Sequence, residues 1–230
     1  MSRTVYDLIG LAAGIAFILA LKGLSHPKTA RRGNLIGAFG AGLATLVVFF
    51  YSNENSSLPL NNLGWILGAI AIGLLIGVPA ARKVQMTQMP QLVALFNGVG
   101  GGAAALVAIV EYLNLGAKAS TPVVVFTVFT VIVGCVSFSG SIITFMKLQE
   151  LMTTRPVIFP AGRFIIAATL ASVLGVGGWV VNSLGTTPLL VLAGLSLLFG
   201  ILFVLPVGGA DVPIVISLLN AFTGLTVAAS

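Results

Sequence analysis

The sequence predicts an all-α fold, a polytopic bundle of transmembrane helices, from three observations. The chain has 230 residues, of which 58% are hydrophobic and only 7% are charged, whereas soluble domains carry about 25% charged residues. The mean hydropathy is +1.14. The apolar residues form long stretches, and the segments of about ten alternating residues that a closed β-barrel needs are absent. We therefore predict an integral membrane protein in which residues 1–230 form one transmembrane domain.

Eight apolar stretches are long enough, at about 1.5 Å of helix per residue, to cross a hydrocarbon core about 30 Å thick. In chain order they are residues 5–22, 34–51, 63–81, 89–113, 121–146, 164–182, 188–206 and 212–230. Glycine recurs within them, in GAFGAG at 37–42 and GVGGGAAA at 98–105. Small residues let membrane helices approach closely, so most of these glycines are predicted to serve helix packing.

The basic residues are distributed unevenly between the two sides of these spans. Nine of the 11 lysines and arginines lie on one side, and Arg3 and Lys118 are the exceptions. The nine are Lys22, Lys28, Arg31, Arg32, Arg82, Lys83, Lys147, Arg155 and Arg163. The positive-inside rule makes that side cytoplasmic and places the N-terminus outside. We predict that these residues contact lipid phosphates at the membrane surface and do not bind nucleic acid.

The last span predicts that more chain follows. Eight spans return the chain to the outside, yet the final stretch reaches Ser230 without a polar anchor. We therefore expect a ninth span beyond the C-terminus, which would carry a following domain into the cytoplasm.

A short pattern occurs at the start of both the fourth and the eighth stretch. Residues 89–101 read MPQLVALFNGVGG and residues 212–224 read VPIVISLLNAFTG. Asn97 and Asn220 each lie seven residues after a proline, which on a helix places them about 10 Å into the membrane. Amide groups without partners are costly in lipid. Both residues are therefore site candidates, either lining a hydrated route or bonding across helices as structural contacts.

The residues that soluble enzymes use for catalysis are missing. The chain has one cysteine, Cys135, and one histidine, His26, so it forms no internal disulfide and no Cys/His metal cluster. It contains no P-loop, no Ser-His-Asp set and no carboxylate pair. Residues 98–103 fit a dinucleotide fingerprint, but no strand precedes them and they lie inside a span. We predict no catalytic residue, no metal and no cofactor in this chain.

Three ordered motifs carry a family resemblance. They read MTQMPQLVALFNGVGGGAAA at 86–105, SFSGSIITFMKLQ at 137–149 and GGADVPIVISLLNAFTG at 208–224. Together with SHPKTARRGN at 25–34 and RPVIFPAGR at 155–163, they closely resemble the β subunit of proton-translocating NAD(P) transhydrogenase. The resemblance runs nearly from end to end.

The resemblance implies a function for the whole complex. In that family hydride passes between NAD(H) and NADP(H) on soluble domains, while protons cross the membrane domain. The β subunit has nine spans and then a cytoplasmic NADP(H)-binding Rossmann domain, so residues 1–230 correspond to its transmembrane proton-translocating part. NAD and NADP are then cofactors of the full complex.

The resemblance also implies partners and a location. The expected partners are the lipid membrane, the missing C-terminal NADP(H) domain, and an α-type subunit that supplies further membrane helices and the NAD(H) domain. The assembly is expected to be a homodimer. The chain is expected to be a multi-pass protein of the bacterial inner membrane.

Four residues match positions of the family with proposed roles. Asn97 falls where many members have an intramembrane histidine on the proton pathway; in the subclass with asparagine, a histidine of the α-type subunit is thought to serve. Asn220 matches a second polar residue of the pathway, and Ser141 matches a serine that lines it. Asp211 matches an acidic residue at the cytoplasmic mouth, where it would couple the pathway to the NADP(H) domain.

Structural interpretations stay open beside these roles. Ser141 is one of three serines within 137–141, which can bond to their own helix backbone. Asp211 precedes Val212 and Pro213 and suits a helix N-cap. For the whole chain, the hypothesis is a membrane pathway whose inward proton flow drives hydride transfer from NADH to NADP⁺. The alternatives are a secondary transporter with a midplane polar site or a purely structural membrane anchor.

Overall fold

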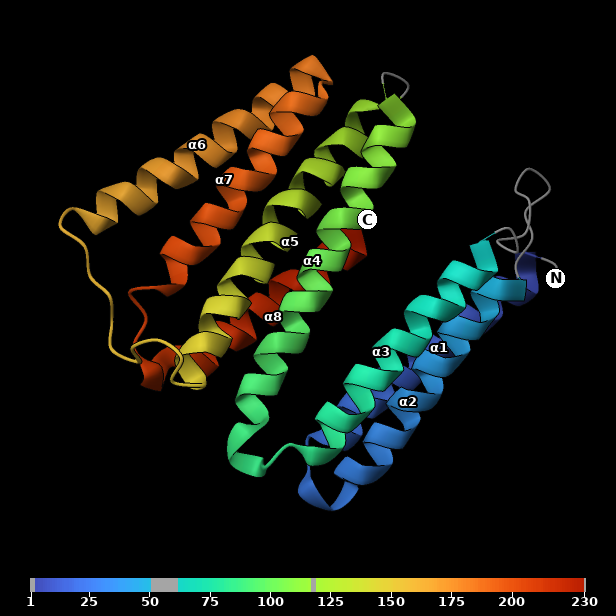
Figure 1. Cartoon of the computed structure of the whole chain (residues 1–230). Helices are drawn as coiled ribbons and strands as arrows, with labels where there is room; N and C mark the ends of the chain where they lie inside the picture. The colour runs from blue at the N-terminus through green and yellow to red at the C-terminus, as the bar shows by residue number, and fades with distance from the viewer. Residues whose placement is uncertain (1–2, 51–61, 117–118, 230) are drawn as a thin grey trace. The chain divides into compact units, whose positions relative to one another are not determined.

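The computed structural model describes residues 3–50, 62–116 and 119–229, and these residues form eight α-helices and no strand (Figure 1). The helices are α1 (Arg3–Leu24), α2 (Pro27–Phe50), α3 (Leu63–Lys83), α4 (Met89–Leu115), α5 (Thr121–Leu148), α6 (Gly162–Ser183), α7 (Thr186–Val204) and α8 (Val212–Ala229). Short 3₁₀ turns, η2 (Met86–Gln88) and η4 (Gly209–Asp211), precede α4 and α8. The predicted all-α membrane bundle is confirmed.

Seven of the helices in the described part of the chain are long and apolar enough to cross a membrane. The remaining helix, α2, begins at Pro27 and therefore includes basic residues that the sequence placed in a connection. Proline suits this first position, where its missing N–H costs nothing. The second predicted span ends at residue 51, which lies outside the described residues. The count of eight spans and the outside N-terminus stay predictions.

The chain divides into two compact units, residues 1–78 and 79–230. In the first unit, α1 and α2 pack against each other through small residues. A Cβ added to Gly23 would lie 2.7 Å from the Gly33 Cα, and one added to Gly40 would lie 3.0 Å from the Ala16 Cβ. A Cβ added to Gly42 would meet nothing within 4 Å. The packing role predicted for glycine therefore holds for Gly40 but not for Gly42.

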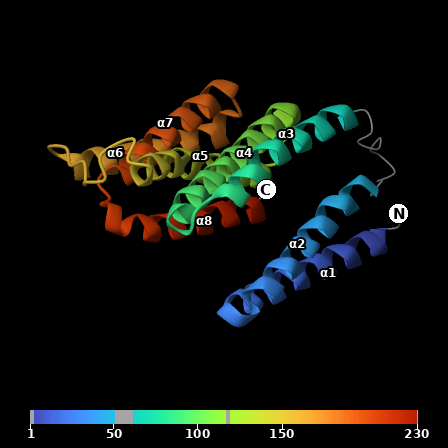
Figure 2. The ribbon, with the colours of Figure 1, turned by 60° about the horizontal axis from the view of Figure 1, so that its bottom comes forward.

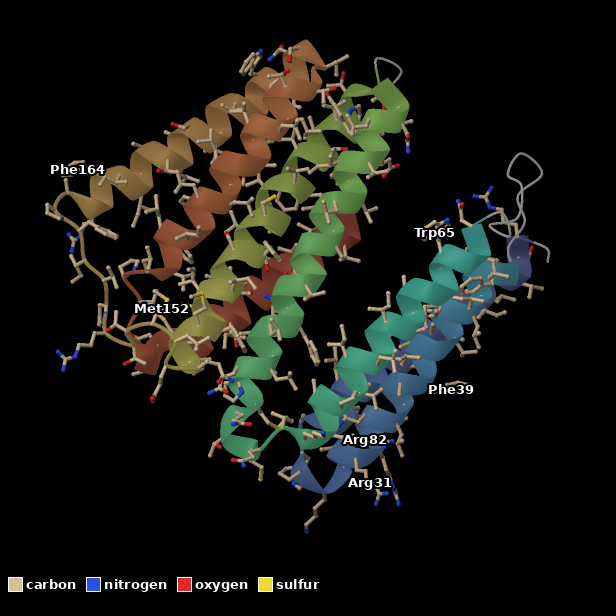
Figure 3. All side chains as sticks on the ribbon, in the orientation of Figure 1. Arg31, Phe39, Trp65, Arg82, Met152 and Phe164 are labelled. Atoms are coloured by element: carbon tan, nitrogen blue, oxygen red, sulfur yellow. The ribbon has the colours of Figure 1, made fainter. Side chains whose placement is uncertain are left out.

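In the second unit, α5 is the central helix. It packs against α4, α6, α7 and α8. In its most apolar segment 61% of the residues are buried inside the protein, against 17% for the corresponding segment of α6. Figures 1 and 2 show α4, α5, α7 and α6 side by side, with α8 across one face of this row. Phe164 projects outward at the start of α6 (Figure 3). Because α5 is enclosed, its polar side chains must find partners within the protein.

Glycines allow the close contact between α4 and α5. A Cβ added to Gly134 would lie 2.7 Å from the Gly101 carbonyl oxygen, and one added to Gly98 would lie 3.1 Å from the Ser141 Cβ. A larger residue at Gly134 would require a backbone shift, and one at Gly98 would push Ser141 back by a few tenths of an ångström. This close approach brings the serines of α5 against α4, beside Asn97.

Candidate functional site

Asn97 lies at the contact between α4 and α5 and exposes only 7% of its surface. Its Nδ2 donates hydrogen bonds to Ser141 Oγ at 2.9 Å and to Ser137 Oγ at 3.1 Å. The two serines are four residues apart on α5, so both hydroxyls lie on the face toward α4. The structure thus brings together Asn97 and Ser141, two of the residues predicted from the sequence.

Ser137 extends these contacts to α8. Its Oγ lies 3.3 Å from the Leu219 carbonyl oxygen, to which it donates, and 2.5 Å from Thr223 Oγ1, where either hydroxyl can be the donor. Thr223 Oγ1 also lies 2.9 Å from the Leu219 carbonyl of its own helix, and because each hydroxyl has one proton, two of these three contacts are hydrogen bonds at any one time. The side chains of Asn97, Ser137, Ser141 and Thr223 therefore form a continuous amide–hydroxyl network across α4, α5 and α8.

One polar atom of the network is left without a hydrogen bond. Asn97 Oδ1 is buried and has no hydrogen-bond partner among the described residues. A buried acceptor without a donor costs about 1–3 kcal/mol, and native proteins contain few such groups. Oδ1 can therefore take a further donor, or the amide can turn by 180° and accept from both serines. The network can relay hydrogen bonds in either direction, but none of its side chains titrates near neutral pH.

Asn220 is not part of this network. Its side chain is exposed on α8 and has no hydrogen-bond partner among the described residues. The buried positions of α8 are Val212, Val215, Ile216, Leu219 and Thr226. Asn220 follows Leu219 by one residue, about 100° around the helix, which places it beside this stripe and not within it. The repeated sequence pattern predicted equivalent positions for the two asparagines, but α4 and α8 bury different faces of the pattern.

Asp211 ends the η4 turn directly before α8, and its side chain is exposed. Its backbone N–H donates to the Gly208 carbonyl at 3.0 Å. Its carboxylate makes no hydrogen bond to the described residues, so the structure gives no support to the capping interpretation. The carboxylate is free to face a partner.

Lys147 is a residue whose surroundings the sequence did not reveal. The prediction that it contacts lipid phosphates at the surface is wrong, because it exposes only 1% of its surface. Its Nζ donates to the carbonyl oxygens of Val204, Leu205 and Val207 at 3.3, 2.5 and 2.7 Å. These carbonyls lie at the end of α7, where the helix dipole is negative. One signal was present in the sequence: Lys147 continues a stripe of small polar residues on α5.

Comparison with known proteins gives consistent matches. The family model described as NAD(P) transhydrogenase beta subunit matches residues 6–230. The chain is 38% identical over 222 residues to the NAD(P) transhydrogenase subunit beta of Rhodospirillum rubrum. A second protein of that name, from a named strain of the same species, matches at the same level. The aligned region covers 93% of this chain and 46% of the relative, so the chain spans about half the length of the curated relatives it matches.

Proposed function

Because this chain belongs to the NAD(P) transhydrogenase beta subunit family, we propose that it forms the membrane proton pathway of a transhydrogenase. Inward proton movement through the complex would drive hydride transfer from NADH to NADP⁺ on soluble domains outside residues 1–230. NAD and NADP would bind to those domains, and this chain would contribute no residue to hydride transfer itself.

The observation that carries this proposal is the amide–hydroxyl network inside an apolar bundle. Polar groups within a membrane span are costly, and they typically mark routes for ions or protons. Asn97 and Ser141 would carry hydrogen bonds along the route, and Ser137 would connect it to α8. Because the network cannot titrate, a histidine of the α-type subunit would accept and release the proton, in the pH range where imidazole does so.

Asn220 and Asp211 would connect the network to the partners. The exposed Asn220 amide would be costly against lipid, so we assign its face of α8 to contact with the membrane helices of the α-type subunit. There the amide would extend the proton pathway. Asp211 would face the cytoplasmic NADP(H) domain and couple its state to α8. The assembly in the bacterial inner membrane would be a homodimer.

Coupling in a reconstituted complex tests the proposal. The full-length β subunit and the α-type subunit would be placed together in lipid vesicles, with a pH-sensitive dye and with NADH and NADP⁺ on one side. We expect proton movement in proportion to hydride transfer. Transport of a solute by the β subunit without nucleotides would favour a secondary transporter. Coupling that survives every substitution in the network would favour a structural anchor.

Replacing Asn220 with leucine should lower coupled turnover about tenfold, the effect of one lost hydrogen bond worth about 1.4 kcal/mol. Assembly and the KM values for both nucleotides should not change, because Asn220 lies within the membrane helix α8 and not in a nucleotide-binding domain. The matched control is Asn182→Leu, which removes an exposed amide whose Nδ2 bonds the Gly178 carbonyl of α6, at 2.7 Å, and no other group among the described residues. Wild-type turnover in Asn220→Leu would remove Asn220 from the pathway.

A further inference from the structure

Lys147 is the centre of a junction between three segments of the second unit. These segments are the end of α5, the α5–α6 connection and the connection 205–211 before α8; we call their meeting point the Lys147 junction. All three N–H groups of the Lys147 ammonium have carbonyl partners, on Val204, Leu205 and Val207. The side chain therefore joins α5 to the last residue of α7 and to the start of the connection that follows it.

Two backbone hydrogen bonds complete the junction. The Val157 N–H donates to the Leu205 carbonyl at 3.1 Å, and the Gly209 N–H donates to the Thr154 carbonyl at 2.9 Å. The Leu205 carbonyl thus accepts hydrogen bonds from both Lys147 and Val157. The α5–α6 connection and the connection 205–211 are held together at the point where Lys147 binds.

The charge of Lys147 is not explained by packing. Within the described ranges no carboxylate lies within ion-pair distance of its Nζ, so only carbonyl dipoles compensate the buried charge. Burying a cation is expensive, and an apolar side chain of similar length could fill the same space at lower cost. An ammonium adds strong, directed hydrogen bonds that fix carbonyl positions in a non-helical segment. The charge therefore indicates a positioning role.

The position of the connection 205–211 matters for the network. The connection carries Asp211 and leads into α8, whose Leu219 and Thr223 contact Ser137. On α5, Lys147 follows Ser141 by six residues, about 9 Å along the helix. Lys147 thus connects the segment 205–211, which contains Asp211, to α5, which contains Ser137 and Ser141.

We propose that Lys147 is a positioning residue of the proton pathway, which fixes the connection 205–211, and with it Asp211 and the start of α8, against α5. Its effect on proton transfer rests on the proposed function, whereas its hold on the connection does not. The two parts can therefore be tested separately.

Hydrogen exchange in the full complex tests the hold on the connection. In Lys147→Met, the backbone amides of residues 205 and 207–211 should exchange about tenfold faster than in the wild type, because the lost bonds make opening easier by about 1.4 kcal/mol. Lys147→Arg keeps the charge and the donors and should restore most of the protection. Lys83→Met is the matched control, since Lys83 is exposed in the last turn of α3. Wild-type exchange in Lys147→Met would overturn the inference.

Coupled turnover tests the effect on the pathway. Lys147→Met should lower kcat about tenfold with unchanged KM for both nucleotides, and Lys147→Arg should recover most of this loss. Faster exchange with wild-type turnover would overturn the pathway role. If Asn97→Leu keeps wild-type turnover while Lys147→Met loses it, the proposed network fails, and Lys147 acts on turnover through the connection 205–211 and Asp211 instead.

A second variant covers the case in which Lys147→Met fails to assemble. Lys147→Gln keeps two N–H donors but carries no charge. Faster exchange at residues 205–211 in this variant would support a need for the ammonium. Wild-type exchange at these residues in Lys147→Gln would overturn the need for the ammonium charge.

Discussion

Replacing Asn97 with leucine should lower proton-coupled turnover of the reconstituted complex roughly 100-fold, because the variant loses two hydrogen bonds worth about 1.4 kcal/mol each. Leucine is similar in size but can neither donate nor accept a hydrogen bond. The variant therefore loses both contacts to the α5 serines and the free Oδ1.

The same substitution should change stability little. Leucine removes two hydrogen bonds, but it also removes a buried acceptor that has no partner. The stabilisation lost with the two hydrogen bonds and the penalty removed with the unpartnered acceptor are of similar size. The free energy of unfolding should therefore change by less than about 2 kcal/mol. A large functional loss in a well-assembled complex would thus separate the pathway role of Asn97 from a role as a structural contact.

Turnover of Asn97→Leu would be measured in vesicles beside the Asn182→Leu control, with assembly checked by gel filtration. The KM values for NADH and NADP⁺ should equal those of the wild type, because the soluble domains are unchanged. Coupled turnover within twofold of the control would contradict a role for Asn97 in proton transfer.

Replacing either Ser137 or Ser141 with alanine should give the second largest loss of coupled turnover. Each substitution removes an acceptor of the Asn97 amide, and Ser137→Ala also breaks the contact to Leu219 and Thr223. We expect about tenfold lower coupled turnover for Ser141→Ala and a larger loss for Ser137→Ala. In an Asn97→Leu background, Ser141→Ala should have little further effect, whereas Ser137→Ala should keep only the part of its effect that comes from its contacts to α8.

The control for the serines lies on the same helix. Ser139 is also buried, but its Oγ bonds the Cys135 carbonyl of α5 itself, at 3.0 Å. Ser139→Ala should therefore keep wild-type kcat in the same vesicle measurement. Equal losses in all three serine variants, or serine effects that persist in full without Asn97, would contradict a network centred on the amide.

The helices could be predicted from the sequence because hydropathy alone indicates long apolar segments. The fourth stretch, predicted at 89–113, is α4 at Met89–Leu115, and the fifth, predicted at 121–146, is α5 at Thr121–Leu148. The start of α2 was predicted seven residues too late, because the basic residues after Pro27 are polar yet helical. Hydropathy indicates which residues lie in lipid, and helices extend beyond that layer.

The candidate site could be predicted only in part, because contacts between helices depend on which faces meet. Bonding to the helix backbone, one interpretation of the α5 serines, holds for Ser139, whereas Ser137 and Ser141 contact Asn97 across the helix contact. That difference is set by the glycines that bring α4 close. Asn220 shares a sequence pattern with Asn97 but lies outside the buried stripe of α8. The surroundings of Lys147 depend on how the connection after α7 packs against α5, which no local pattern indicates.

The most direct measurement is water-edited solid-state NMR of the assembled complex with ¹⁵N-labelled asparagine. It detects transfer of magnetisation from water to each side-chain amide, and comparison with Asn97→Leu identifies the signal of Asn97. A hydrated proton pathway requires transfer to the Asn97 amide as rapid as transfer to amides at the protein surface. Transfer as slow as that of a dry protein core would contradict a proton pathway through this network.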